Sequence, residues 1–260
     1  MAEAVREVLA FGTADDVADA AAFLFVNLAA QAVAERGRFF VSLAGGTTPL
    51  ACYRLLTAPL IARKVNWEAT HVFFGDERRV PAGHPDRNDE AAFDALLRHV
   101  PIPEKNVHRV PVDEPDAAER YESEVRGAFS IFSPSSSKGI PRFDLVFLGL
   151  GPDGHTASLF PGHSSLEETQ RLVLCVEDSP KPPPSRVTFT LPLLNAARHV
   201  ALLVTGKDKA PALARVLADD EALPAARLNP DGTLVILADS AALSLSKNLP
   251  RPKASAPADR

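Results

Sequence analysis

Residues 143–156 read Phe-Asp-Leu-Val-Phe-Leu-Gly-Leu-Gly-Pro-Asp-Gly-His-Thr, an apolar run that ends abruptly in a glycine-rich turn. The run predicts a buried strand, and the turn after it carries Asp153 and His155 two residues apart. Turns at the ends of central strands are where α/β proteins place chemistry, because rigid strands aim loop residues at one crevice. An imidazole there can exchange protons near neutral pH. The stretch therefore predicts an enzyme with proton transfer at this turn.

On both sides of this turn, apolar strands alternate with helices. We expect helices over 14–36, 50–56, 89–98, 115–129 and 210–218, and further strands over 39–43, 71–74, 172–176, 187–191, 200–205 and 234–237. Thr13 and Gly37 are residues of the kinds preferred just before and just after a helix. The alternation predicts a single α/β domain, residues 1–246, with a mostly parallel sheet covered on both faces. Residues 247–260, proline-rich, basic and aperiodic, are expected to form a disordered tail.

Composition excludes several classes of protein. The 260 residues are 46% hydrophobic and 23% charged, as in a globular chain with a sizeable core. A net charge of -5 argues against general binding of nucleic acid or membrane surfaces, so cations for an anionic ligand must be gathered locally. No apolar run approaches the length expected of a membrane span. Cys52 and Cys175 are too few for a disulfide scaffold, so we expect a soluble, cytoplasmic protein.

A second glycine turn, Gly45-Gly46-Thr47-Thr48-Pro49, lies between a predicted strand and the start of a helix. Its glycines let the backbone approach a ligand closely, its hydroxyls can donate hydrogen bonds, and a helix N-terminus favours an anion. Taken alone, such a turn is more often a plain connection. No Gly-Lys-Ser/Thr ending follows, so the turn is not a nucleoside-triphosphate loop and fits a monophosphate better.

Two motif matches are better explained by chance. Gly149, Gly151 and Gly154 have the spacing of the dinucleotide fingerprint, but Asp153 would place a carboxylate beside the pyrophosphate. The proline–glycine pair at 161–162 would also cut short the long helix that this fingerprint needs. The Ser-x-x-Lys match at 135–138 lies in a loop without a helix to support a nucleophile.

Metal binding is not expected, and neither is a cofactor. The seven histidines include no pair with helical ligand spacing. His155 stands apart because a glycine turn presents it and Asp153 is near enough to orient it. Proton transfer without a metal is therefore the better interpretation.

Further charged residues follow the predicted strands. Asp76 and Arg78 come directly after one strand, Arg186 lies where a polyproline segment enters another, and Lys207 and Lys209 precede a helix. Each alone would most often be a solvated surface charge. Together they include the bidentate and point-charge donors that a phosphate needs.

In chain order, these motifs resemble those of the 6-phosphogluconolactonases, in the glucosamine-6-phosphate isomerase/6-phosphogluconolactonase superfamily. The matching segments are Leu-Ala-Gly-Gly-Thr-Thr-Pro at 43–49, Gly-Asp-Glu-Arg at 75–78, the block at 149–162 and Pro-Pro-Pro-Ser-Arg-Val-Thr at 182–188. The resemblance implies a three-layer α/β/α sandwich with a modified Rossmann-like sheet. It also implies metal-free hydrolysis of 6-phospho-D-glucono-1,5-lactone to 6-phospho-D-gluconate, in the oxidative pentose phosphate pathway.

The resemblance also implies roles for particular residues. His155 would act as general base, oriented by Asp153 or another nearby carboxylate, and Asp76 matches a strand-end acid of the superfamily. Arg78 would bind substrate hydroxyls or the oxyanion. The phosphate would be held by Gly45, Gly46, Thr47, Thr48, Arg186 and Lys209. The expected partner is the sugar-phosphate lactone alone, with no nucleic acid or membrane, and the chain is expected to be a monomer or weak homo-oligomer.

Two alternatives remain open at this point. Glucosamine-6-phosphate deaminases share the Asp-Gly-His turn but continue to a catalytic glutamate, where this chain has Leu159-Phe160-Pro161. A non-catalytic sugar-phosphate sensor would be expected to lack the proton-transfer residues, whereas Asp76, Asp153 and His155 are all present. Both observations favour the lactonase.

Overall fold

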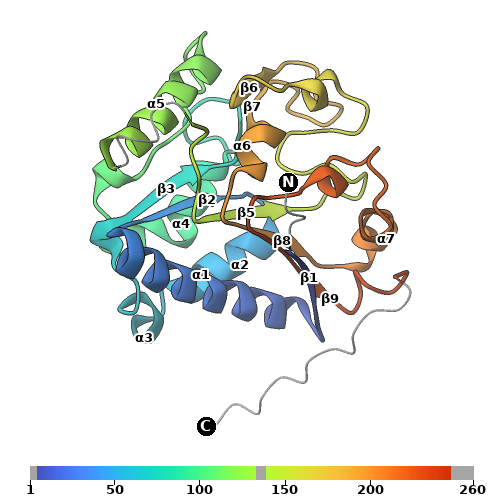
Figure 1. The fold of residues 1–260 in the computed structure, drawn as a ribbon, viewed down its shortest axis with the longest axis horizontal. Helices are drawn as coiled ribbons and strands as arrows, with labels where there is room; N and C mark the ends of the chain where they lie inside the picture. Colours follow the sequence, from blue (N-terminus) through green and yellow to red (C-terminus); the bar gives the residue numbers. More distant parts are fainter. Residues whose placement is uncertain (1–4, 133–138, 247–260) are drawn as a thin grey trace.

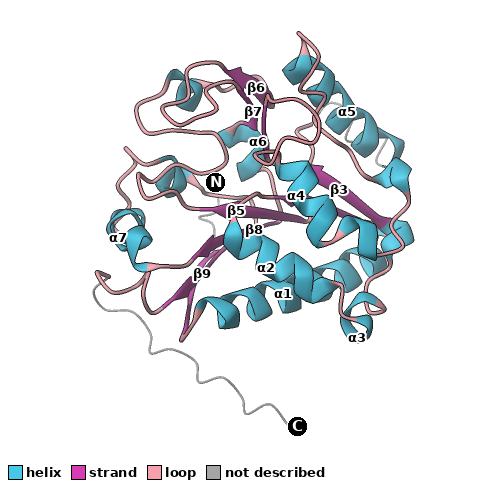
Figure 2. Ribbon diagram, turned by 180° about the vertical axis from the view of Figure 1, so that it is seen from behind, coloured by secondary structure: helices cyan, strands magenta, loops and turns pink. Residues whose placement is uncertain are grey.

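A computed structural model describes residues 5–132 and 139–246. The expected disordered tail at 247–260 and the Ser-x-x-Lys match at 135–138 lie outside the described residues. The described part contains a six-stranded sheet with helices on both faces and a smaller three-stranded sheet beside it (Figures 1 and 2).

The six-stranded sheet is parallel throughout and runs in the order β1-β9-β8-β5-β2-β3. Its strands are β1 (Val5–Phe11), β2 (Phe39–Leu43), β3 (Thr70–Phe74), β5 (Leu145–Gly149), β8 (His199–Val204) and β9 (Thr233–Asp239). Strand β1 was not predicted. It pairs with β9 at the edge of the sheet, where its half-exposed Val-Arg-Glu-Val pattern is a weaker signal than a buried run.

The helices are α1 (Ala14–Arg36), α2 (Thr47–Leu56), α3 (Pro59–Ala62), α4 (Asn88–Ala95), α5 (Ala117–Phe132), α6 (Leu191–Asn195) and α7 (Ala210–Leu217). The prediction for the first helix is confirmed at both ends. Thr13 and Asp16 form a reciprocal capping box, and Gly37 ends the helix in the left-handed conformation with φ 75°. The expected helix over 89–98 is shorter, because a 3₁₀ turn over Leu97–His99 replaces its last part.

Two aromatic clusters show that the main sheet is covered on both faces. Successive side chains of a strand point to opposite faces, and Phe39 and Phe40 of β2 do so. Phe39 packs edge-on against Phe25 of α1 with ring centroids 5.2 Å apart. Phe40 stacks on Phe129 of α5 at 4.1 Å. The predicted three-layer α/β/α arrangement is thus confirmed.

Helix α1 corrects one expectation from composition. Among the described residues it is long and apolar enough to cross a membrane, with a mean hydropathy of 1.6 over an 18-residue stretch. In the structure it is a core helix: Val17, Ala21 and Phe25 are fully buried, and it packs against α2 and β9. The many alanines of α1 raise its hydropathy. Their small side chains also suit close packing against α2 and β9.

The expectation of one sheet is wrong for the strands near 172–176 and 187–191. These are β6 (Val173–Val176) and β7 (Arg186–Phe189), which pair antiparallel with each other. The segment Asp76–Arg78, expected as a loop, is strand β4 and pairs antiparallel with β7. The small sheet β4-β7-β6 therefore leads directly out of the end of β3 and carries Asp76 and Arg78 with it.

The only two tyrosines of the chain both hold the backbone just where the site loops leave the main sheet. The Tyr53 hydroxyl, on α2, accepts from Ala44 N at 2.9 Å and donates to Ala44 O at 3.0 Å, directly after β2. The Tyr121 hydroxyl, on α5, accepts from Phe74 N at 2.8 Å at the end of β3. Both side chains are almost fully buried. They tie the loops to helices on opposite faces of the sheet.

Replacing Tyr53 with Phe should lower the free energy of unfolding by about 1–3 kcal/mol, because Ala44 N–H and C=O lose their partner in a partly buried position. Urea unfolding of both proteins would measure the difference. The control is Ser130→Ala, which removes an exposed hydroxyl bound to Arg126 O and should change stability by at most about 0.5 kcal/mol. Equal effects of the two substitutions would contradict the role of Tyr53.

Candidate active site

A cavity of about 340 Å³ opens where β2, β5 and β8 end. From β2 the chain continues outward to β3, then returns to the other side of β2 as β5 and proceeds to β8. The order of strands therefore reverses between β2 and β5, and the two glycine turns that follow these strands face one crevice. The cavity is lined by Ala44–Pro49, Asp76, Arg78, Asn88, Gly149–Pro152, His155, Ala157, Lys181, Leu203, Thr205 and Lys209.

His155 lies in this cavity with its ring held by a carboxylate. Its Nδ1 is 2.5 Å from Asp153 Oδ1, and Lys181 Nζ lies 3.1 Å from that same oxygen. Because the carboxylate accepts, Nδ1 of the neutral ring carries the proton, which leaves Nε2 as the basic nitrogen. Phe160 packs on the ring with centroids 4.9 Å apart. Such an arrangement suits general-base chemistry at Nε2.

The pKa values of the pair follow from burial and from their neighbours. Burial lowers the pKa of His155 below its usual value, and this outweighs the opposing effect of Asp153, while Lys181 lowers the pKa further. Burial alone would raise the pKa of Asp153, but the hydrogen bonds from His155 and Lys181 outweigh it and bring this pKa to about 2. At neutral pH the centre therefore holds a neutral imidazole beside an ionised carboxylate.

Gly151 allows the pair to sit against the backbone of its own turn. A Cβ on Gly151 would lie 2.0 Å from His155 Nδ1 and 2.5 Å from Asp153 Oδ1, distances that no side chain tolerates. The turn is closed by hydrogen bonds from Gly151 N to His155 O and from Gly154 N to Gly151 O. The glycine is needed here for space, because the ring and the carboxylate occupy the position that a Cβ would take.

Asp76 faces the same cavity and is held by two donors. Ser158 Oγ donates to its Oδ2 at 2.7 Å, and Asn88 Nδ2 lies 3.3 Å from its Oδ1. Asn88 Nδ2 also donates to Asp76 O at 2.9 Å. The carboxylate, 7% exposed, is thus presented in one orientation from strand β4.

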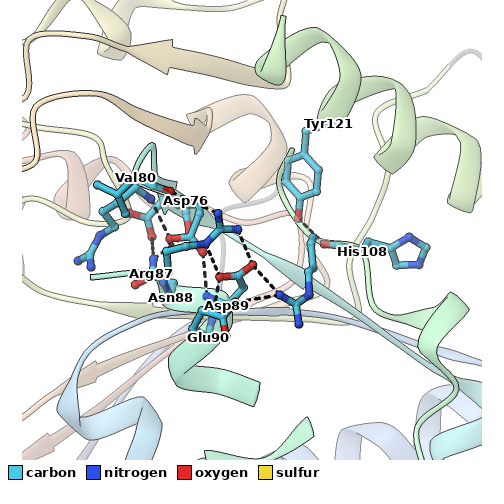
Figure 3. A network of polar contacts seen from close by, with 11 residues as sticks. Asp76, Val80, Arg87, Asn88, Asp89, Glu90, His108 and Tyr121 are labelled. Carbon is cyan, nitrogen blue, oxygen red and sulfur yellow. Dashed lines mark hydrogen bonds and ion pairs between the residues drawn. The ribbon is translucent and has the colours of Figure 1, made fainter. Parts of the chain in front are cut away.

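A polar network positions the segment that carries Asn88, and Figure 3 shows Arg87, Asn88 and Asp89 in this network. The buried carboxylate of Glu77 accepts hydrogen bonds from Asn88 N and Asp89 N, each at 2.8 Å, and so caps the start of α4. Burial raises the pKa of Glu77, and those amides act against the shift. Arg87 makes two hydrogen bonds to Asp89, at 2.8 and 2.6 Å, with both side chains buried. This network fixes the loop that returns from β4 to the cavity.

The other end of the cavity is suited to an anion. Helix α2 begins at Thr47 with no side-chain cap, so its first amide groups point toward the cavity end lined by Gly46. Thr48 Oγ1 and Thr205 Oγ1 lie 2.6 Å apart across the gap between the ends of β2 and β8. Lys209, which follows β8, also lines the cavity, and its ammonium group pairs with Asp208 at 3.1 Å. Two hydroxyls, a helix N-terminus and one cation converge there.

All the residues to which the resemblance gave roles line the cavity, except Asp153 and Arg186. Asp153 lies behind His155, as predicted for an orienting carboxylate. Arg186 does not line the cavity: it is 4% exposed, and its guanidinium donates to the carbonyls of Lys181, Pro182 and Pro183. This placement favours support of the loop that carries Lys181 over direct contact with a phosphate.

Four residues of the site were missed from the sequence: Lys181, Asn88, Ser158 and Thr205. Lys181 directly precedes the polyproline segment that Arg186 follows. Its position beside that segment was the one feature of the sequence that could have marked Lys181 as a site residue. Asn88 directly precedes the helix expected over 89–98 and belongs to no motif. Its role depends on the loop over 79–87 folding back onto β4, which no local pattern indicates. Within residues 5–132 and 139–246, no group of three or more His, Cys, Asp or Glu side chains is arranged to hold a metal ion.

The fold and the site define an α/β enzyme with an acid–base centre in the crevice between two glycine turns. The sequence profile described as glucosamine-6-phosphate isomerases/6-phosphogluconolactonase matches residues 12–236, and the chain belongs to this family. It is 40% identical over 251 residues to a protein of Oryza sativa named probable 6-phosphogluconolactonase 4, chloroplastic, covering 93% of this chain and 77% of that one. It is 38% identical over 240 residues to the 6-phosphogluconolactonase of Mycobacterium bovis, covering 90% and 96%.

Solved structures agree with this assignment. The 6-phosphogluconolactonase of Thermotoga maritima is 31% identical and superimposes with a TM-score of 0.78 over 90% of this chain and 99% of that one. A glucosamine-6-phosphate deaminase superimposes with a TM-score of 0.75 at 21% identity, over 92% of this chain and 99% of that one, which shows a shared fold only.

Replacing Gly151 with Ala should lower kcat by about 10²-fold, because the new Cβ displaces His155 and a misplacement of about 1 Å has an effect of that size. Steady-state kinetics would measure it. Gly127→Ala is the matched control, since Gly127 lies in α5 and a Cβ there meets no atom within 4 Å. An unchanged kcat in Gly151→Ala would show that the close approach of His155 to Gly151 is unimportant for catalysis.

Replacing Lys181 with Met should move the acid limb of the pH–rate profile to higher pH. With neutral His155 as the base, kcat/KM is expected to be lost as pH falls through the pKa of His155, which the Lys181 charge helps to keep low. Without that charge the pKa rises, and activity is lost at a higher pH than in the wild type. Lys207→Met, at an exposed lysine outside the lining, should leave the profile in place. A downward shift in Lys181→Met would contradict this electrostatic role.

Proposed function

We propose that His155 is the general base of a lactonase, and that this chain hydrolyses 6-phospho-D-glucono-1,5-lactone to 6-phospho-D-gluconate in the oxidative pentose phosphate pathway. The observation that carries the proposal is the oriented His155–Asp153 pair in a cavity whose other end is suited to a phosphate. The names of the family's relatives agree with this reaction.

In the mechanism, His155 Nε2 takes a proton from a water molecule as that water attacks the lactone carbonyl carbon. Asp153 stabilises the imidazolium that forms, through the Nδ1 hydrogen bond. The oxyanion of the tetrahedral intermediate lies near the cations of the cavity, Arg78 and Lys181. The carbon–oxygen bond of the ring then breaks, and the imidazolium returns the proton to the departing ring oxygen. The products are a hydroxyl and a carboxylic acid, which releases its proton to solvent to become the carboxylate, with no metal or cofactor required.

The remaining site residues bind the substrate. Gly45, Gly46, Thr47 and Thr48 surround the phosphate with backbone amides and hydroxyls, and Lys209 neutralises part of its charge. The carboxylate of Asp76 accepts from sugar hydroxyls, since Ser158 and Asn88 hold it in one orientation. Arg186 supports the loop that brings Lys181 to the centre.

A deaminase is the weaker assignment. Where a deaminase places its catalytic glutamate, this chain has Leu159 and Phe160, which are fully buried, and Phe160 packs on the His155 ring. The sensor alternative is disfavoured because the acid–base pair is intact and oriented.

For the cellular setting, we propose a single domain over residues 1–246 that acts in the cytoplasm as a monomer or weak homo-oligomer, with the lactone as its partner. Both cysteines are unpaired, which suits a reducing compartment. The compartment varies among relatives, since the Oryza sativa protein is named chloroplastic. Size-exclusion chromatography with light scattering would test the oligomeric state.

Purified protein should hydrolyse the phosphorylated lactone in the presence of EDTA, and His155→Ala should lower kcat by about 10²–10⁴-fold. Production of 6-phosphogluconate is measured with a coupled dehydrogenase. His163→Gln is the matched control, because His163 binds Ser165 and Asp178 in a loop and lies outside the cavity lining. Wild-type activity that EDTA abolishes would contradict the metal-free mechanism.

Lys209→Ala should raise KM for the phosphorylated lactone about tenfold or more, through loss of a charge-assisted contact. Hydrolysis of unphosphorylated gluconolactone should change little. An equal loss with both substrates would remove Lys209 from the phosphate site.

A further inference from the structure

Strand β9 ends in a buried acid, next to the turn that carries Thr205 and Lys209. β9 is the neighbour of β8, with Ala238 opposite Val204, and Asp239 is the last residue of β9. Because the two strands are parallel, the turns that follow them leave the sheet at the same edge. Asp239 is 5% exposed and does not line the cavity. Any effect of this acid on a ligand therefore passes through other residues.

The Asp239 carboxylate accepts hydrogen bonds from the backbone of two different turns. Its Oδ1 accepts from Ala242 N at 2.7 Å, in the turn that follows β9. Both of its oxygens also accept from Gly206 N, at 3.1 and 3.0 Å, in the turn that follows β8. The first contact is local and closes the turn that Asp239 itself begins. The second joins residues 33 positions apart, and capping a local turn does not require it.

Gly206 connects this contact to residues that line the cavity. It directly follows Thr205, whose Oγ1 lies 2.6 Å from Thr48 Oγ1. Its carbonyl oxygen accepts from Lys209 N at 3.2 Å, which closes the 3₁₀ turn before α7. The amide of Gly206 is thus held by Asp239, while its carbonyl holds the backbone of Lys209. The carboxylate fixes the peptide from which both lining residues take their places.

The conformation of Gly206 makes such a restraint useful. Its φ is 95°, in the left-handed region, and a Cβ there would lie 2.8 Å from Asp208 Oδ1. Glycine reaches this conformation without strain, but it reaches many others as readily. The hydrogen bonds from Gly206 N to Asp239 orient the peptide bond that follows Thr205 and favour one path for the turn.

The position of the Lys209 ammonium group depends on that path. In the structure it is paired with Asp208 Oδ2 at 3.1 Å. A phosphate at this end of the cavity competes with the neighbouring carboxylate, so the distance from the ammonium group to the phosphate decides how much the contact contributes. If the turn is displaced, Lys209 keeps its pairing with Asp208 and loses part of its contact with the ligand.

We propose that Asp239 is a positioning residue for the phosphate end of the cavity, where Thr48, Thr205 and Lys209 converge. It acts through the backbone amide of Gly206 and sets the places of the two lining residues on either side of that glycine. This inference rests on the proposed function, in which that end of the cavity binds the phosphate of the lactone. It assigns part of the preference for phosphorylated substrates to a residue that does not touch the substrate.

Replacing Asp239 with Ala should raise KM for the phosphorylated lactone about tenfold and leave kcat nearly unchanged, because groups that bind the phosphate move while the His155–Asp153 pair stays in place. Hydrolysis of unphosphorylated gluconolactone should match that of the wild type. Calorimetric titration with inorganic phosphate, at fixed ionic strength, should show affinity weakened about tenfold.

Two further variants separate the contacts of this carboxylate. In Asp239→Ser the shorter side chain still caps its own turn at Ala242 N but does not reach Gly206 N, so KM should rise as in Asp239→Ala. In Asp239→Asn one acceptor oxygen remains at full reach, and most of the wild-type KM should return. Thermal unfolding identifies a temperature at which each variant is folded. Asp239→Ser decides the test should Asp239→Ala not fold.

Glu122→Ala is the matched control. Glu122 also accepts from two backbone amides, Leu172 N at 2.9 Å and Val173 N at 3.3 Å, and it lies outside the cavity lining. This variant should lose stability without a change in KM or in phosphate affinity.

Wild-type KM and phosphate affinity in folded Asp239→Ser would overturn the proposal, since Asp239 would then only cap its own turn. An equal loss with both lactones, or the same rise of KM in Glu122→Ala, would also overturn it. A wild type that binds phosphate without hydrolysing the lactone would contradict the proposed function alone. Phosphate titration of the Asp239 variants would then decide the positioning role by itself.

Discussion

The pairing of β2 with β5 at the centre of the sheet is the constraint on which the site depends. Val41 lies opposite Leu145 and Ser42 opposite Val146, although about a hundred residues separate them along the chain. Because both strands point the same way, the turns that follow them end at one edge of the sheet. One turn carries the uncapped start of α2 and the other carries His155. A phosphate site and a proton-transfer group thus lie across one cavity.

The site around His155 and Asp76 is built by close packing of polar side chains against the backbone. His155 and Asp153 occupy the space beside Gly151 that any other residue would fill. Glu77 caps α4, and so brings Asn88 against Asp76 and beside Gly45, where a Cβ would lie 1.9 Å from Asn88 Oδ1. Tyr53 and Tyr121 hold the backbone at the ends of β2 and β3. These contacts hold the groups in place before a substrate arrives, which reduces the reorganisation that the reaction requires.

The two ends of the sheet carry different charge patterns. At the carboxyl ends, the cations Arg78, Lys181 and Lys209 share the cavity with Asp76 and the His155–Asp153 pair. At the amino ends, the charged residues that line a second cavity are Arg36, Arg38, Arg142, Asp144 and Arg198. A net charge of -5 for the whole chain hides both patterns, because charge summed over a sequence carries no information about which side chains meet.

Local patterns were enough to predict the helix over 14–36, the buried strands β2, β5 and β8, and the turns at 45–49 and 149–156. The reason is that capping residues, apolar runs and glycines act over a few neighbouring positions. The same patterns placed His155, Asp153, Asp76 and Lys209 at strand ends. They did not reveal that β6 and β7 leave the main sheet, that Arg186 lies under a loop, or that Lys181, Asn88 and Thr205 reach the cavity. Those features arise from pairings between segments far apart in the chain. Such pairings depend on which surfaces remain to be buried after the central sheet has formed. Local sequence patterns do not specify those surfaces.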